Sequence, residues 1–553
     1  MKSKTLFFLI ILIFLTLLLN GEVPDEESDL VVKSSKATWT PPYIRSSGVM
    51  KVLVIFIKFS DDILEESPIT DLWPHTLNTL PTWAGDIVSS TVLTQYSHPS
   101  MSGYYHEMSS GEYHVIGDVY ENLYIPLHPQ SYYYRSNSKG IHYVAEEILT
   151  ELDPYINYSK YDNDGPDGIS RYDGSTDDDG IVDMILLCFR TFSSGNLDAA
   201  GSGYSGIASL SGKFSSFPSG DFLTFDGVQI ESGFPGSGTI QKDMYSLDQM
   251  NTLIHEFGHY LFGAIHYPHR RWGLMDYGVG CMTGFEREKL GWISYKTPTS
   301  SFEITDAISD NDIYSVPIPG SYYHYIIENR TGSSFYDSQW LNPYGELMTP
   351  GHGLLISKIY NDIYYTQLES AEGKWDWLKS GSVYVYPFQQ TNENPVSGKN
   401  ELLLKDVYTT AGKKSHPDFL GDQEDLFNYT ERNSFTPCTN PPSTTVSILI
   451  TDEDEDGNLT INYYPKSVFG DISVNQTWDE NTLICGNTTI HNGIEIYVEE
   501  DITVKKDVTL TVENGVTFKF ASAKQLHVYG DIVVNGTSEY PVIFTRDDPS
   551  STY

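Results

Sequence analysis

The chain is poor in basic residues. It has 34 Lys and Arg against 74 Asp and Glu, which gives a formal net charge of −40 over 553 residues. A surface of this charge repels nucleic acid and anionic membranes, and it favours solubility and the binding of cations such as calcium. We therefore expect no nucleic-acid partner and count Ca²⁺ as an expected cofactor. The length predicts about two to four domains.

Cysteine is scarce as well. The four cysteines are far apart and form no CxxC pair: Cys188, Cys281, Cys438 and Cys485. Four cysteines allow about three pairings, and their spacing does not choose among them. Cys188 lies in the apolar run 184–189, which is typical of a buried strand, so we expect a buried thiol there rather than a disulfide.

Long apolar runs occur only near the N-terminus. Lys2 and Lys4 precede an apolar run over residues 6–19, and Asn20 and Gly21 follow it. This order is typical of a signal peptide, here residues 1–21; the alternative is a membrane anchor, because the run is near the lower length limit for a span. We expect a secreted, extracellular protein without stable membrane insertion after cleavage. Any attachment to the cell surface would come through a region beyond residue 553.

A zinc-binding pattern is present in the middle of the chain, at His255, Glu256 and His259. On a helix, residues four apart lie on one face, so the two imidazoles can bind one divalent ion. Glu256 lies beside that face and can take a proton from a water that zinc has activated. The alternative is a chance HExxH on an amphipathic helix. The expected chemistry is hydrolysis of peptide bonds.

The local sequence favours the helix that this geometry needs. Ser246 and Gln249 form a capping-box start, and Gly263 can end the helix in a left-handed conformation. An apolar stripe at helical spacing lies between them: Met250, Leu253, Ile254, Phe257 and Leu261.

A catalytic zinc takes three protein ligands, so a third is expected. His266 is the first choice because it follows Gly263 closely enough to fold back on the metal. The alternatives are His269, Asp276, Glu286 and Glu288, of which the glutamates would make the site thermolysin-like.

An acidic tract precedes the zinc pattern. Closely spaced carboxylates with glycines between them can surround a calcium ion with oxygen atoms. Pro166 rules out a full EF-hand loop, and a solvated loop is the alternative. The candidate calcium ligands are Asp162, Asp164, Asp167, Asp177, Asp179 and Asp183.

Periodicity divides the chain into five parts. The signal peptide is followed by an acidic pro-segment or linker, residues 22–48. Residues 49–300 alternate strands and helices, with a buried strand at 50–59, a helix within 97–111 and another at 140–152, which favours an α/β or α+β core. Residues 301–466 predict an all-β, sandwich-like module. Residues 467–553 have short strands punctuated by glycine, typical of the start of an incomplete right-handed parallel β-helix.

These pieces together resemble the immune inhibitor A family of secreted zinc metallopeptidases, which are similar to the metzincins. The resemblance covers roughly residues 50–300 and, more loosely, the module that follows. It is carried by segments in the family's order: 52–61, 104–111, 160–165, 179–183, 255–259, 274–275, 289–292 and 328–330.

The resemblance implies His255 and His259 as zinc ligands, Glu256 as general base and Met275 as the methionine of a turn beneath the metal. Tyr277 resembles the tyrosine that steadies the oxyanion in astacin-like sites; core packing is its alternative. The family has Gly three residues and Asp six residues after the second His. This chain has Phe262 and Ile265 at those positions, with Gly263 and His266 one residue later.

Three functions follow from these patterns. The first is a secreted zinc endopeptidase that hydrolyses extracellular proteins or peptides. The second is a catalytically inactive adhesion or binding protein that uses its β modules, against which the intact Glu256 argues. The third is a calcium-dependent structural protein. Protein hydrolysis with and without a zinc chelator distinguishes them.

Overall fold

All residues that the computed structural model describes belong to one compact unit of the chain, Thr40–Tyr553. The predicted signal peptide and most of the predicted linker lie outside them. Within the described part, no helix is long and apolar enough to cross a membrane. The described residues are 47–63, 73–94, 100–163, 170–171, 178–191, 217–220, 222–231, 238–243, 250–262, 267, 269, 272–275, 280–338, 351–360, 366–373, 375–380, 383–389 and 423–547.

A parallel sheet forms the centre of the N-terminal part. Its strands follow the order β2-β1-β4-β7, and the short β3 also pairs with β1. The pairs β1–β2, β1–β3, β1–β4 and β4–β7 are all parallel. The strands are β1 (Gly48–Ile57), β2 (Tyr113–Val119), β3 (Ser170–Arg171), β4 (Met184–Phe189) and β7 (Gly238–Asp243).

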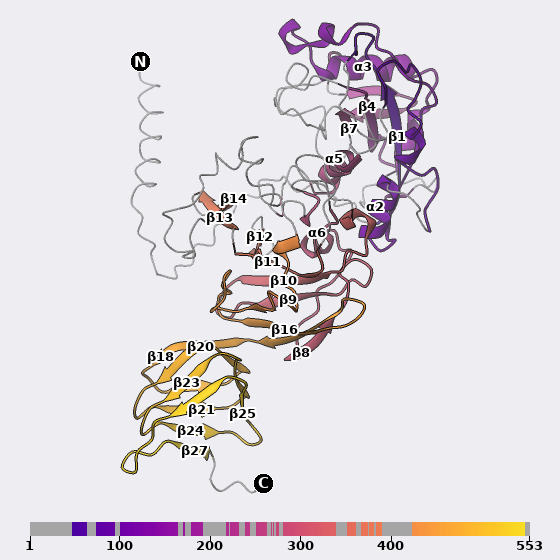
Figure 1. Ribbon diagram of the computed structural model, residues 1–553. Helices are drawn as coiled ribbons and strands as arrows, with labels where there is room; N and C mark the ends of the chain where they lie inside the picture. The colour runs from indigo at the N-terminus through magenta and orange to yellow at the C-terminus, as the bar shows by residue number, and fades with distance from the viewer. Residues whose placement is uncertain are drawn as a thin grey trace, which may run out of the picture. The chain divides into compact units, whose positions relative to one another are not determined.

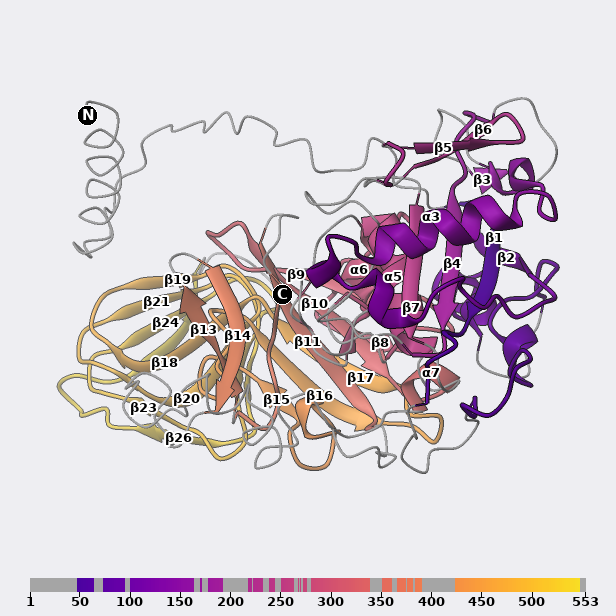
Figure 2. The ribbon, with the colours of Figure 1, turned by 90° about the horizontal axis from the view of Figure 1, so that it is seen from above.

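Helices cover both faces of this sheet, which explains why β1 and β4 are continuous apolar runs. Met50, Val52, Val54 and Phe56 of β1 belong to the core that includes α2 (Met101–Met108) and α5 (Met250–Phe262). The alternate side chains of β1, at Leu53, Ile55 and Ile57, pack in a second core with α3 (Ile141–Leu152). Figure 1 shows β4 and β7 between α3 and α5, and Figure 2 shows α3 lying across the strands.

Smaller elements complete this part of the chain. A hairpin is formed by β5 (Phe222–Phe225) and β6 (Val228–Glu231). Two short helices follow α5, namely α6 (Gly284–Lys289) and α7 (Phe335–Ser338). Helix α6 begins with a capping box: the Thr283 side chain accepts from the Glu286 backbone, and the Glu286 side chain accepts from the Thr283 backbone.

The next part, which we call the antiparallel module, has two four-stranded sheets that share one core. One sheet has the order β12-β11-β10-β9, and the other has the order β15-β16-β17-β8. A separate pair is formed by β13 (Trp375–Ser380) and β14 (Val383–Gln389). The strands of the two sheets are β8 (Ser301–Ile304), β9 (Ile313–Pro317), β10 (Tyr323–Arg330), β11 (Gly353–Tyr360), β12 (Thr366–Leu368), β15 (Ser434–Phe435), β16 (Ser447–Glu453) and β17 (Leu459–Tyr464).

The last part, residues 466–547, is called the coil module here. Its strands are all parallel and form two sheets whose apolar side chains meet in one core. Each turn of the chain stacks on the preceding one, as Figure 1 shows, and Phe518 stacks on Phe544 with ring centroids 4.9 Å apart. The strands are β18 (Lys466–Ile472), β19 (Gln476–Trp478), β20 (Thr482–Ile490), β21 (Glu495–Val498), β22 (Ile502–Val504), β23 (Thr509–Val512), β24 (Thr517–Phe520), β25 (Leu526–Val528), β26 (Asp531–Val534) and β27 (Ile543–Arg546).

The structure resolves the cysteine pairing. Cys438 of the antiparallel module and Cys485 of β20 form a disulfide, with Cα atoms 6.0 Å apart. Cys188 is a buried thiol, as the sequence predicts, and Cys281 is also buried. The disulfide therefore joins the last two modules and leaves the sheet around β4 without a covalent link.

Candidate metal centre

Helix α5 brings the three residues of the zinc pattern together. His255, Glu256 and His259 are 7%, 8% and 8% exposed. The rings of His255 and His259 have centroids 4.9 Å apart and are nearly perpendicular, at 86°. The apolar stripe of the helix packs in the core beneath the sheet. The helix therefore holds two imidazoles and a carboxylate in a nearly water-free position.

A second segment fixes the first of these rings. Nδ1 of His255 lies 2.6 Å from the carbonyl oxygen of Leu274. A carbonyl oxygen can only accept, so Nδ1 carries the proton and the lone pair of the neutral ring is on Nε2. Metal-binding histidines in proteins commonly donate their other N–H to such a group, which fixes tautomer and orientation. The donor chemistry of this pair fits a divalent metal ion.

Met275 packs against the same helix at its glycine. A Cβ atom built on Gly258 would lie 2.5 Å from Sδ of Met275 and 3.0 Å from Cδ2 of Leu274. Only a residue without a side chain leaves room for this approach. Met275 is fully buried, and its carbonyl oxygen accepts from the Tyr267 backbone at 2.7 Å. The segment thus turns beneath the helix with Met275 inward.

Glu286 holds this turn from the other side. Its carboxylate accepts the backbone N–H groups of Leu274 at 3.1 Å and Met275 at 2.7 Å, and that of Thr283 at 2.8 Å. The side chain is fully buried, and burial raises its pKa to about 7, against the opposing effect of these hydrogen bonds. Glu286 is therefore a positioning residue for the Leu274 carbonyl that meets His255.

A buried arginine connects this region to the antiparallel module. Arg330 of β10 donates to the carboxylate of Asp337 at 2.8 Å and to the Met282 carbonyl at 3.1 Å. It also donates to the Trp272 carbonyl at 3.4 Å, and the Trp272 indole donates to Asp425 at 2.9 Å. The segment before and after Met275 is thereby tied to strands far along the chain.

The choice of a third metal ligand depends on which candidate side chains lie close to the histidine pair. Among the described residues, no group of three His, Cys, Asp or Glu side chains is placed to hold a metal ion. His269, Glu286 and Glu288 are described residues, so the structure does not bring these alternatives into a ligand set. His266 and the alternative Asp276 lie outside the described residues, as does Tyr277.

His269 occupies a different environment. It is fully buried, and neither ring nitrogen has a hydrogen-bond partner among the described residues. Burial, and secondarily the charge of Arg330, lowers its pKa to about 3. Its ring lies 6.2 Å from that of Phe285. His269 is thus a neutral core histidine under ordinary conditions.

Part of the acidic tract lies near the sheet. Asp162 is 8% exposed; one carboxylate oxygen accepts from the Gly180 backbone at 3.0 Å, and Oδ1 has no partner among the described residues. Burial and the charges of Asp178 and Asp179 raise the pKa of Asp162 to about 7. A bound cation would remove this repulsion. Asp164, Asp167 and Asp177 lie outside the described residues.

Asp183 links the tract to helix α5. Its carboxylate accepts from the Asn163 backbone at 2.5 Å and from the hydroxyl of Tyr260, on α5, at 3.3 Å. Asn163 in turn exchanges two hydrogen bonds of 3.0 Å with the Lys51 backbone on β1. These hydrogen bonds connect the tract to strand β1 and to the helix that carries the histidines.

Sequence reasoning missed the positioning roles of Glu286, Arg330 and Asp183. The sequence marked Glu286 only as an alternative zinc ligand and Asp183 only as a candidate calcium ligand. The sequence signal that could have pointed to Arg330 is the run of polar residues Glu-Asn-Arg that ends the strand β10, because charged residues are rarely buried unless they are paired.

Comparisons with known proteins add no relative. No protein-family model matches the chain, and no curated protein sequence matches it.

Proposed function

We propose that this protein is an exported zinc endopeptidase whose metal is held by His255, His259 and a third ligand, for which His266 is our assignment. The observation that carries the proposal is the hydrogen bond from Nδ1 of His255 to the Leu274 carbonyl. It selects the tautomer that a metal-binding imidazole needs. The buried Glu256 beside the pair supplies the carboxylate that peptide hydrolysis requires.

The roles of the residues follow from their chemistry. Zinc, when bound, supplies Lewis acidity to the site. Glu256 takes the proton from the attacking water as the new C–O bond forms. It then gives that proton to the amine nitrogen as the C–N bond breaks, so the carboxylate is restored. Glu286 and Met275 keep the Leu274 carbonyl in place, which orients the His255 ring.

Two further parts of the proposal concern stability and location. We assign a calcium ion to the acidic tract, with Asp162 as a ligand; support comes from its buried Oδ1, which has no hydrogen-bond partner in the part of the chain that the structure describes. The disulfide between Cys438 and Cys485 and the signal-peptide pattern both support an oxidising, extracellular location. We assign the coil module to the parallel β-helix class, which its stacked parallel strands support.

The experiment is hydrolysis of casein by the purified chain, measured with and without a zinc chelator. Activity that a chelator abolishes and added zinc restores is the expected result. Chelator-insensitive activity would contradict the metal mechanism. A chain that contains zinc but cleaves no protein would favour the inactive binding protein.

A further inference from the structure

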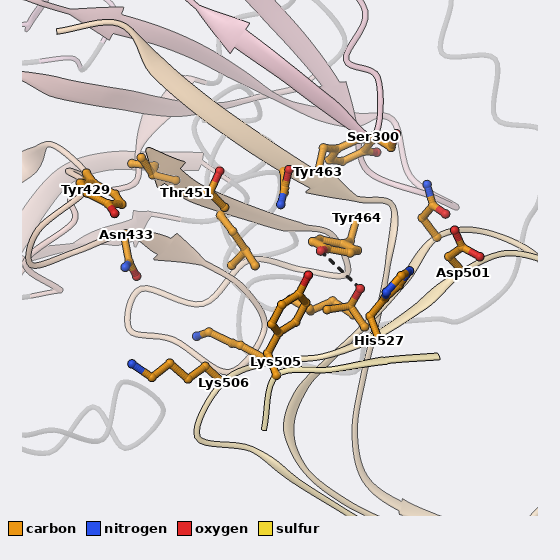
Figure 3. Close-up of a pocket in the computed structure, with 17 residues that line it drawn as sticks. Ser300, Tyr429, Asn433, Thr451, Tyr463, Tyr464, Asp501, Lys505, Lys506 and His527 are labelled. Atoms are coloured by element: carbon orange, nitrogen blue, oxygen red, sulfur yellow. Dashed lines mark hydrogen bonds between the residues drawn. The ribbon is translucent and has the colours of Figure 1, made fainter. Parts of the chain in front are cut away.

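A cavity of about 750 Å³ lies between the antiparallel module and the coil module, far along the chain from the metal centre. This volume is in the range of sites that bind small molecules. As Figure 3 shows, Thr451 and Tyr463 come from one wall and Lys505 and His527 from the other. The first wall is built by β16 and β17, and the second by β20, β22 and β25.

The two walls are fastened to each other. The disulfide from Cys438 to Cys485 joins the two modules. Lys505 donates from Nζ to the Ser434 hydroxyl at 3.2 Å, and the hydroxyls of Tyr464 and Thr503 lie 3.5 Å apart, as drawn in Figure 3. The cavity is therefore preformed, which lowers the entropic cost of binding.

The coil-module wall has a regular surface. Leu483, Thr503 and His527 are in register on the successive parallel strands β20, β22 and β25, and all three line the cavity. Neighbouring strands are about 4.8 Å apart. A linear ligand with repeating units can contact such a column at equivalent points.

The lining chemistry favours sugars over apolar molecules. Ligand sites for apolar compounds are lined mainly by aliphatic and aromatic groups with few polar atoms. Four tyrosines and three asparagines line this cavity: Tyr429, Tyr463, Tyr464, Tyr529, Asn433, Asn462 and Asn481. Aromatic faces can stack on the C–H faces of sugar rings, and amides and hydroxyls can donate to and accept from sugar hydroxyls.

Most of the strands around the cavity offer no free edge to a peptide strand. Peptides that add to a sheet need a free strand edge. β16 pairs with β15 and β17, and β17 pairs with β16 and β8. On the other wall, β22 pairs with β20 and β25. Of the strands that face the cavity, β16, β17, β20 and β22 have partners on both sides, whereas β25 ends its sheet with β22 as its one partner among the described strands, so a peptide could pair only there.

The charge of the lining is opposite to that of the chain. Lys505 and Lys506 line the cavity with one carboxylate, Asp501, whereas acidic residues outnumber basic ones about two to one overall. Asp501 accepts from the Gln525 backbone at 2.9 Å. The Lys505 ammonium bonds a neutral hydroxyl, and burial lowers its pKa. An anionic ligand would compensate this half-buried positive charge.

We propose that the cavity binds an acidic oligosaccharide, a chain of sugar rings that carries uronate carboxylates. The rings stack on the exposed faces of Tyr529 and Tyr429, which are 71% and 40% exposed. A carboxylate of the ligand lies at Lys505 and Lys506. This site needs no metal and does not depend on the peptidase activity of the chain.

The test is calorimetric titration of the full chain with three uronate oligosaccharides of different linkage, namely oligogalacturonate, oligoguluronate and a glucuronate-containing oligomer. Neutral glucose and galactose oligomers of equal length are titrated in parallel. We expect at least one acidic oligomer to bind. The neutral glucose and galactose oligomers should bind about tenfold or more weakly, because a charge-assisted hydrogen bond is lost.

Variants place the binding in this cavity. The double variant with Lys505→Gln and the more exposed Lys506→Gln should weaken binding about tenfold. Tyr529→Ala should weaken binding about fivefold, because one aromatic stacking contact is lost. Tyr540→Ala, a matched control on an exposed tyrosine of the coil module outside the lining, should leave affinity unchanged.

Three results would overturn the proposal. The first is that none of the acidic oligomers binds at millimolar concentration. The second is a lack of specificity. It would appear either as equal affinity for acidic and neutral oligomers or as a weakening by Tyr540→Ala that is as large as the weakening by Tyr529→Ala. The third is tighter binding of a polyglutamate peptide that Tyr529→Ala also weakens, which would assign the cavity to acidic peptides.

Discussion

Nδ1 of His255 lies 2.6 Å from the carbonyl oxygen of Leu274, and this contact connects helix α5 to the turn beneath it. The turn is itself held by the Glu286 carboxylate through the Leu274 and Met275 backbones. The imidazole is thus oriented by a chain of hydrogen bonds that ends in a fully buried carboxylate. In our account this chain prepares the site for metal before any metal is bound.

The close approach of Met275 to Gly258 gives the first prediction. Gly258→Ala should lower the melting temperature and the zinc affinity, because its Cβ would lie 2.5 Å from the Met275 sulfur. Overpacking of this kind costs about 1–3 kcal/mol, more than the gain of about 1 kcal/mol in helix propensity. Gly85→Ala is the matched control, since nothing lies within 4 Å of its added Cβ. Equal melting temperatures for the two variants would argue against this packing.

The third ligand gives the second prediction. His266→Ala should lose most of its bound zinc and its activity, because two imidazoles alone hold zinc weakly. His269→Ala should keep its zinc, since His269 joins no ligand set among the described residues. Metal analysis of both purified variants, below their melting temperatures, decides the matter. Zinc loss in His269→Ala with full zinc in His266→Ala would reverse our assignment.

His269 also predicts a pH dependence of stability. Burial lowers its pKa to about 3, from 6.5 in an unfolded chain, so the folded state binds fewer protons between these values. Its contribution to the free energy of unfolding is therefore present above pH 6.5 and is lost as the pH falls toward 3, by up to about 1.4 kcal/mol per pH unit. His269→Met should flatten the decline in melting temperature between neutral and acidic pH.

The control for this comparison is His352→Gln, because His352 is exposed. Its melting temperature should follow that of the wild type across the same pH range. If His269→Met and the wild type lose stability in parallel, the histidine is not held neutral in the fold.

Calcium gives the fourth prediction. Added calcium at constant zinc should raise the melting temperature, because a cation relieves the repulsion among Asp162, Asp178 and Asp179. Asp162→Asn should reduce this rise, whereas Asp452→Asn, an exposed aspartate of β16, should leave it intact. Equal melting temperatures in excess calcium and in a calcium chelator would remove the site from our account.

Local sequence patterns predict the elements better than the contacts between them. The apolar stripe places α5 at Met250–Phe262, and the buried run predicted at 50–59 is β1 at Gly48–Ile57. The helix predicted within 97–111 is shorter, Met101–Met108, because the Ser100 side chain caps it by accepting from the Gly103 backbone. The predicted ends of α5, at Ser246 and Gly263, lie outside the described residues.

The candidate site shows where such reasoning stops. Spacing alone places His255, Glu256 and His259 on one helix, because i and i+4 share a face. The role of Glu286 depends on a turn formed by residues 274–275, and that of Arg330 on a strand in another module. These contacts are set by tertiary packing, which no local period encodes. The cavity lined by Tyr464 and Lys505 likewise exists only because two modules meet.

The most direct test of the central claim compares zinc content and casein turnover in the wild type and in Glu256→Gln, prepared identically. The substitution keeps the shape of the side chain and both histidines but removes the base, which is typically worth about 10² to 10⁴ in rate. We predict one zinc per chain in both proteins and turnover lower by about that factor in the variant alone. Near-equal turnover with zinc bound, or a wild-type chain that binds no zinc, would contradict the account.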